Sequence, residues 1–189
     1  MRRIIFRVTA VFPLAAMLVL MIWSLFVPGY SSIAQHLSEL DLLHHPIAIA
    51  TRIVSFIVGL PLVAFGVALL FGKAPRMVFT GATSLLLGAS MISTGIFLMG
   101  SPLHGLYGVA IVLILVPACY AAELPRRNET RLDVTISLIV ASANLAYVWL
   151  LLNDLEPHAV RGLTQRISIL ITFGWYSYAS TALLRIIAS

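Results

Sequence analysis

Residues 47–71 read IAIATRIVSFIVGLPLVAFGVALLF, and Arg52 is the only charged side chain in this run. A helix needs about 20 predominantly apolar residues to cross the ~30 Å hydrocarbon core of a bilayer. Helices are the expected form in lipid because backbone N–H and C=O groups must find their partners within the segment. The run therefore predicts a transmembrane helix with one arginine a few residues inside its first end.

The rest of the chain repeats this pattern. Five further apolar runs cover approximately Val8–Val27, Met77–Met99, Leu106–Ala122, Leu132–Leu152 and Ile167–Ile187. Residues 72–76 and 123–131 form short turns between runs, and the longest connection is the loop over residues 28–46. The sequence thus predicts an all-α fold, a polytopic bundle of six spans forming a single transmembrane domain over residues 1–189.

The composition indicates the same class. Hydrophobic residues make up 60% of the chain and charged residues 10%, whereas soluble domains carry about 25% charged residues. The net charge of +5 comes from short basic clusters between the apolar runs, and no nucleic-acid-binding motif is present. We therefore expect membrane lipids as partners and no nucleic acid.

The first run leaves two interpretations open. Met1–Arg7 is basic, like the first region of a signal peptide, and Ser32-Ile33-Ala34 is a passable cleavage site. The apolar run Val8–Val27 is longer than the roughly 7–15 residues of a signal peptide, and the cleavage site lies well beyond it. This length favours an uncleaved signal-anchor.

Basic residues predict the orientation. Nine of the 12 fall on one side of the six runs: Arg2, Arg3, Arg7, Lys73, Arg76, Arg126, Arg127, Arg131 and Arg185. Only Arg52, Arg161 and Arg166 fall on the other. Cytoplasmic loops carry the excess of Lys and Arg, so both termini are predicted to be cytoplasmic. The loop over residues 28–46 and all five histidines then lie outside.

The outer loop predicts a short interfacial helix over Ser31–Leu43, with leucines along one face. A charge inside an apolar run is costly unless it is paired, so we predict that Arg52 pairs with Glu39 or Asp41. The alternative is that Arg52 extends to the headgroups and only anchors its helix.

A weak internal repeat places Arg52 and Arg166 at equivalent points of the second and sixth runs. If these helices are neighbours, the two guanidinium groups converge and require something negative between them. The interpretation is a polar pocket open to the outside, for a lipid headgroup or small amphiphile. Its candidate ligand-binding residues are Ser38, Glu39, Arg52, His104, Gln165 and Arg166. If the helices are apart, each arginine acts alone.

Two other functions stay open, and the sequence does not establish whether the protein is an enzyme. A membrane-embedded hydrolase could hold a metal with His36, Glu39, His104 and His158, but no His-Glu-x-x-His motif occurs, and no cofactor is predicted. The second function is that of a small transporter. It is suggested by the internal repeat, by the prolines within the runs and by the polar Asn144 near the middle of its run. Trp175 and Tyr176 either line a cavity facing Asn144 or make helix contacts.

Glycines recur every seven residues at Gly59 and Gly66, and at Gly81, Gly88 and Gly95. This spacing keeps one helical face and lets two helices approach closely. It predicts tight helix packing, and it leaves a homo-oligomer through these faces open.

Short motifs then point to a family. Ser38-Glu39-Leu40 lies in the long outer loop, Gly95-Ile96-Phe97 precedes His104-Gly105, and Gly162–Arg166 leads into the last run. The chain resembles the prokaryotic membrane family known as domain of unknown function 998. The resemblance implies six helices in a bacterial or archaeal cytoplasmic membrane, and no activity. Two departures are Asp41, where the family often has glycine, and Met99–Pro102, where it often has an acid.

Overall fold

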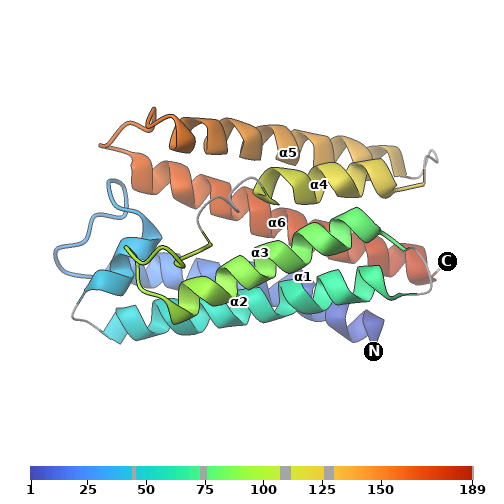
Figure 1. Ribbon diagram of the computed structural model, residues 1–189, viewed down its shortest axis with the longest axis horizontal. Coiled ribbons are helices and arrows are strands. Elements are labelled where there is room, and N and C mark those ends of the chain that lie inside the picture. Colours follow the sequence, from blue (N-terminus) through green and yellow to red (C-terminus); the bar gives the residue numbers. More distant parts are fainter. Residues whose placement is uncertain (44–45, 73–75, 107–111, 126–129, 189) are drawn as a thin grey trace.

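The computed structural model describes residues 1–43, 46–72, 76–106, 112–125 and 130–188 (Figure 1). These residues contain helices and no strand, which confirms the all-α prediction. The elements are α1 (Arg2–Ser24), a 3-10 helix η1 (Leu37–Leu42), α2 (Pro46–Leu70), α3 (Val78–Ile96), α4 (Val112–Glu123), α5 (Arg131–Leu152) and α6 (Arg161–Ala188).

Five of these helices, α1, α2, α3, α5 and α6, are long and apolar enough to cross a membrane. The chain is therefore a multi-pass helical membrane protein. Helix α4 has 12 described residues. The predicted span Leu106–Ala122 includes residues 107–111, which lie outside the described residues, so a sixth span stays a prediction.

The helices pack in a ring that follows their order in the chain. Helix α1 packs against α2 and α6, α3 against α2 and α4, and α5 against α4 and α6. Both termini lie at one end of the bundle (Figure 1), where Arg3 Nη2 is 3.5 Å from the carbonyl oxygen of Ile187. We call this the terminal end. The opposite end, which holds η1, residues 97–106 and the start of α6, is called the loop end.

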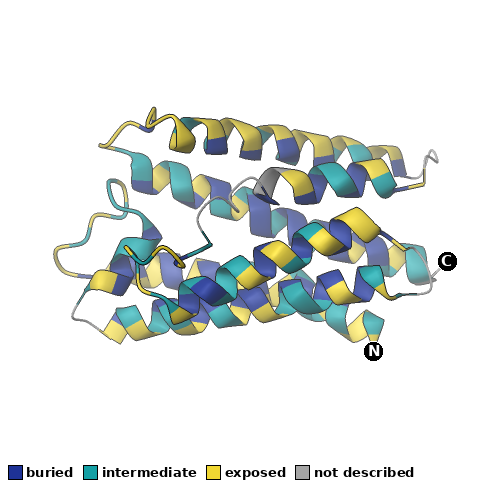
Figure 2. Ribbon diagram, in the orientation of Figure 1, coloured by how far each residue is buried: buried dark blue, intermediate teal, exposed yellow. Residues whose placement is uncertain are grey.

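Aromatic side chains fill the centre of the ring. Phe65 of α2 meets Tyr176 of α6 with ring centroids 5.4 Å apart, and Tyr176 meets Trp175 at 5.0 Å. Tyr176 donates to Ser84 Oγ and Trp175 donates to Ser137 Oγ, so both polar tips are satisfied. The helix-contact interpretation of these two residues is confirmed. Exposed residues lie along the outside of the helices (Figure 2), and many of them are large apolar residues, as expected of a surface facing lipid.

Glycines hold α2 and α3 together. A Cβ atom added to Gly59 would lie 2.8 Å from the carbonyl oxygen of Gly88, and one added to Gly66 would lie 2.6 Å from that of Gly81. The reverse contacts, from Gly88 to Gly59 and from Gly81 to Gly66, are both 2.9 Å. The two glycine faces thus cover each other within one chain, and a homo-oligomer would need another surface.

The outer loop differs from the expected helix over Ser31–Leu43. Only Leu37–Leu42 is helical, as a 3-10 helix with Leu37 and Leu40 buried. The segment before it is fixed by close packing instead. A Cβ atom on Gly162, at the start of α6, would clash with the backbone of Gln35. The loop therefore sits directly on the first turn of α6.

Candidate functional site

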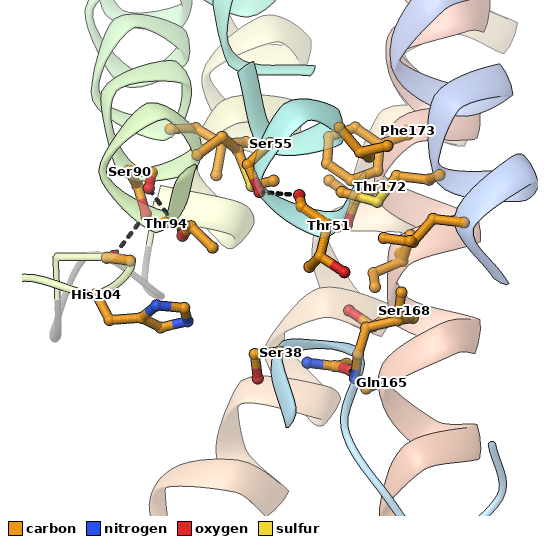
Figure 3. Close-up of a pocket in the computed structure, with 18 of the residues that line it drawn as sticks. Ser38, Thr51, Ser55, Ser90, Thr94, His104, Gln165, Ser168, Thr172 and Phe173 are labelled. Carbon is orange, nitrogen blue, oxygen red and sulfur yellow. Dashed lines mark hydrogen bonds between the residues drawn. The ribbon is translucent and has the colours of Figure 1, made fainter. Parts of the chain in front are cut away.

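A cavity of about 320 Å³ lies inside the ring at the loop end (Figure 3). Its apolar wall includes Met17, Leu20, Leu87, Met91, Ile169 and Phe173. Its polar groups are Ser38, Thr51, Ser55, Ser90, Thr94, His104, Gln165, Ser168 and Thr172, together with Tyr147. No Asp, Glu, Lys or Arg is among the described residues that line it. The cavity is therefore amphipathic and carries no fixed charge.

Most of the hydroxyl groups in this wall donate their hydrogen within the protein. Thr51 donates to the carbonyl oxygen of Ile47 at 2.8 Å, and Ser55 donates to that of Thr51 at 3.0 Å. Thr172 donates to Asn144 Oδ1 at 3.2 Å, which also accounts for the polar residue in the middle of α5. Because their protons are committed, these oxygens offer acceptor lone pairs to a ligand.

His104 presents a defined edge to the cavity. Its Nδ1 lies 2.8 Å from the carbonyl oxygen of Phe97, and a carbonyl can only accept, so Nδ1 carries a hydrogen. The neutral ring then has Nε2 as an acceptor. Ser90 holds the same loop on α3 by donating to the carbonyl oxygen of Gly105 at 2.6 Å. Figure 3 shows the ring directed into the cavity.

The structure brings together only some of the residues that the sequence predicted for a polar pocket. Ser38, His104 and Gln165 line the cavity. Gln165 also fixes η1, because its Oε1 accepts the N–H of Leu37 at 2.6 Å. Glu39, Arg52 and Arg166 are not among the lining residues, and each makes contacts of its own.

Arg166 ties the outer loop to α6. It is 8% exposed. Nη1 donates to the carbonyl oxygens of Gln35 and Gly162, and Nη2 donates to Ser24 Oγ and to Tyr30 Oη at 2.8 Å. Burial raises the pKa of the Tyr30 hydroxyl, and the neighbouring guanidinium opposes that rise. Arg166 is thus a buried anchor rather than a group exposed at the headgroups.

Arg52 does not pair with Glu39 or Asp41, so that prediction is wrong. Its Nε donates to the carbonyl oxygen of Gly95 and its Nη2 to that of Ile96, both at 3.0 Å. These carbonyls end α3, where no later N–H of the helix can reach them. The guanidinium therefore caps the neighbouring helix, and the two arginines have separate sets of partners instead of one shared cleft.

Glu39 pairs with Arg161, with Oε1 and Nη2 3.0 Å apart. His36 Nε2 lies 3.2 Å from a carboxylate oxygen of Glu156. His158 is exposed. In the part of the chain that the structure describes, no group of three His, Cys, Asp or Glu side chains is placed to hold a metal ion. The four metal candidates therefore do not form one site.

Asp41 is a buried acid of η1, near the cavity residue His104. It is 6% exposed, and neither carboxylate oxygen has a hydrogen-bond partner among the described residues. Burial raises the pKa of this carboxyl, while Arg52, His104 and the nearby backbone of Met99 oppose the rise. The Met99 backbone acts on the charge from close range without meeting the geometry of a hydrogen bond.

A family model described as a protein of unknown function, DUF998, matches residues 10–182. The chain belongs to the DUF998 family. This confirms the resemblance drawn from the short motifs. No curated protein and no solved structure matches the chain. The matched region of this DUF998 protein contains every residue that lines the cavity.

Sequence reasoning missed most of the cavity wall in this DUF998 chain. Thr51, Ser55, Ser168 and Thr172 are small polar residues inside apolar runs, and such residues commonly bond to the backbone of their own helix. Their type therefore gives no sign of which ones face a cavity. Asp41 is predicted from the sequence as a partner for Arg52 and as a departure from the family pattern. Its place within the short leucine-rich segment Leu37–Leu42 was the available signal for its burial.

Proposed function

We propose that this protein is a six-span protein of a bacterial or archaeal cytoplasmic membrane that binds a small amphiphile in the loop-end cavity. The observation that carries the proposal is the cavity itself. Its volume of about 320 Å³ is at the lower end of the range for small-molecule sites, and its lining combines apolar side chains with hydrogen-bonding groups. An apolar tail would pack on Met17, Leu87 and Phe173, with the head near Ser38 and His104.

The absence of fixed charge on the described lining favours an amphiphile with a hydrogen-bonding head over a doubly charged phosphate head. Arg52 and Arg166, which would have attracted such a head, already donate to protein oxygens. The head would instead find the Nε2 edge of His104, the amide of Gln165 and the hydroxyl of Ser38.

Six spans with both termini inside agree with the arrangement of the bundle. The two chain ends meet at the terminal end, as an even number of crossings requires. Arg2, Arg3, Arg7, Arg131 and Arg185 belong to the helix turns at that end, and the loop end holds Arg52, Arg161 and Arg166. The positive-inside rule would then place the cavity on the outer side.

Decan-1-ol is a suitable probe because it has an apolar chain and an uncharged hydrogen-bonding head. We expect saturable binding to the protein in lipid nanodiscs. Ser168→Phe, which fills the cavity, should abolish it, whereas Thr181→Phe on the exposed face of α6 should leave it intact. Ser168→Leu provides a smaller filling residue in case the aromatic ring prevents folding. Equal binding by all variants would reject the cavity as the site.

The two other functions have less support. The candidate metal ligands His36 and Glu39 are engaged with Glu156 and Arg161. A transporter of the broken-helix type would interrupt its spans at the binding site. Helices α1 and α2 each run through a proline without a break.

A further inference from the structure

Asp41 is the one buried acid beside the cavity whose oxygens have no hydrogen-bond partner in the described structure. An ionised carboxylate is costly at such a site, because burial removes its water and no described hydrogen-bond donor replaces that water. The residue is nonetheless flanked by two basic side chains, Arg52 from α2 and His104 from the loop after α3. A buried ionisable group that is kept at such a cost is a candidate functional site.

Arg52 and His104 are held near Asp41 in different ways. Arg52 keeps its position by donating to the carbonyl oxygens of Gly95 and Ile96, so it supplies charge to Asp41 without a direct ion pair. His104 is near both Asp41 and the cavity, since it acts on the charge of Asp41 and also lines the cavity wall. Glu39, the other acid of η1, is held by Arg161 instead.

We propose that Asp41, Arg52 and His104 form a proton-binding cluster whose charge sets the affinity of the cavity for an amphiphile with an anionic head. This inference rests on the proposed function, because it concerns the same cavity. With Asp41 ionised, Arg52 cationic and His104 neutral, the three charges sum to zero. One added proton, on the Asp41 carboxyl, leaves one net positive charge.

The proton is placed on Asp41, because a buried carboxyl whose oxygens have no hydrogen-bond partner among the described residues favours its neutral form. The cavity has no fixed charge among its described lining residues, so this proton is the variable charge nearest to a bound head. By reciprocity, a proton that favours the anion is itself bound more tightly when the anion is present. Anion binding should therefore take up a proton.

The test compares decane-1-sulfonate, whose head stays ionised, with the neutral decan-1-ol, on the full chain in nanodiscs of uncharged lipid. In the wild type, sulfonate affinity should fall as pH rises from about 5 to about 9, approaching tenfold per pH unit where the cluster loses its proton. Decan-1-ol affinity should not change. Asp41→Asn leaves the cluster positive at every pH, so this variant should bind sulfonate at high pH as tightly as the wild type does at low pH.

Asp154→Asn, an exposed acid after α5, is the matched control and should keep the wild-type profile. The inference is overturned if Asp41→Asn retains the wild-type pH dependence, or if wild-type sulfonate binding is independent of pH. Binding of decan-1-ol without any binding of sulfonate also overturns it, and leaves the proposed function standing. If neither compound binds at any pH, the proposed function fails and this inference fails with it.

Discussion

Arg52 is an example of a charged side chain in an apolar run that is stabilised without a counter-ion in contact. Its two hydrogen bonds to carbonyl oxygens at the end of α3 are charge-assisted, and such bonds contribute about 1.5–3 kcal/mol each. Arg52→Ala should lower the free energy of unfolding by an amount in this range. Thermal unfolding in detergent measures the loss, with the exposed Arg131→Ala as control. Equal stability of the two variants would contradict the capping role.

Asp41 predicts a pH effect of defined sign. Because burial raises the pKa of its carboxyl, the folded state favours the neutral form. The stability it contributes is present below the ordinary aspartate pKa of about 4 and is lost as pH rises through the raised value. Asp41→Asn should therefore raise the melting temperature at neutral pH and have little effect near pH 4. A lower melting temperature at neutral pH would mean that the ionised form is the stable one.

The sequence predicted which individual residues are unusual. It did not predict which groups those residues contact. The position of Arg52 inside an apolar run is visible without a structure. Its partners Gly95 and Ile96 are on another helix, and backbone carbonyls carry no side-chain signal. The nearest acids in sequence were a reasonable guess, but η1 directs Glu39 to Arg161 at the start of α6.

Helix α3 has its first turn capped by a residue from another helix. Glu123, at the end of α4, accepts the backbone N–H groups of Phe79 and Thr80, both at 2.8 Å, and the Thr80 hydroxyl at 2.7 Å. A carboxylate at a helix N-terminus satisfies free donors and interacts favourably with the helix dipole.

Glu123→Ala should destabilise the protein by roughly 1–3 kcal/mol, because two backbone N–H groups and one hydroxyl lose their acceptor. Glu123→Gln should lose less, since its amide oxygen can still accept one of the bonds. Chemical unfolding in mixed micelles would show this order. A Gln variant as damaged as the Ala variant would mean that the charge, rather than the hydrogen bonds, provides the stability.

The close contact between α2 and α3 leads to a prediction about helix packing. In Gly88→Ala, the new Cβ would lie 2.8 Å from the backbone nitrogen of Val63 and 2.9 Å from the carbonyl oxygen of Gly59. These are backbone atoms, so the helices must separate, at a cost of about 1–3 kcal/mol.

Gly174→Ala on α6 is the matched control, because nothing lies within 4 Å of its added Cβ. It should be neutral or stabilising by about 0.5–1 kcal/mol, since alanine is the better helix former. Paired unfolding measurements on the two variants decide the question. If both lose stability equally, the close approach of α2 and α3 is not what the glycines provide.

Glycine spacing alone predicted that some helices approach closely. It did not show whether the two glycine faces meet within one chain or pair with a second copy, because both arrangements allow the same close approach. The structure selects α2 against α3, where each glycine meets a carbonyl of the other helix. The 3-10 geometry of η1 was not predictable from its leucine pattern, since packing on α6 and α2 limits the helix to six residues.

For the whole molecule, hydropathy was enough to predict a helical membrane protein and the approximate limits of its long helices. It could not give the ring order, because apolar faces in lipid do not specify their neighbours. The cavity depends on that order, with η1, α2, α3 and α6 each supplying part of its wall.

The orientation of the whole protein in the membrane can be tested directly. Reporter fusions at Gly72 and Arg127 should give cytoplasmic signals, and fusions at Gly100 and Pro157 should give outside signals. The reason is the nine-to-three division of basic residues between the two sides. An outside signal at Arg127 or a cytoplasmic one at Gly100 would contradict the topology and turn the cavity toward the cytoplasm.

The capping of α3 by Arg52 also has a consequence for biogenesis. When α2 leaves the ribosome, the carbonyls that satisfy its arginine belong to residues 43 and 44 positions further along the chain, which have not yet emerged. Releasing α2 alone into lipid would expose a guanidinium, whereas a paired hairpin hides it. We therefore expect the insertion machinery to retain the second helix until the third arrives, and to release the two together.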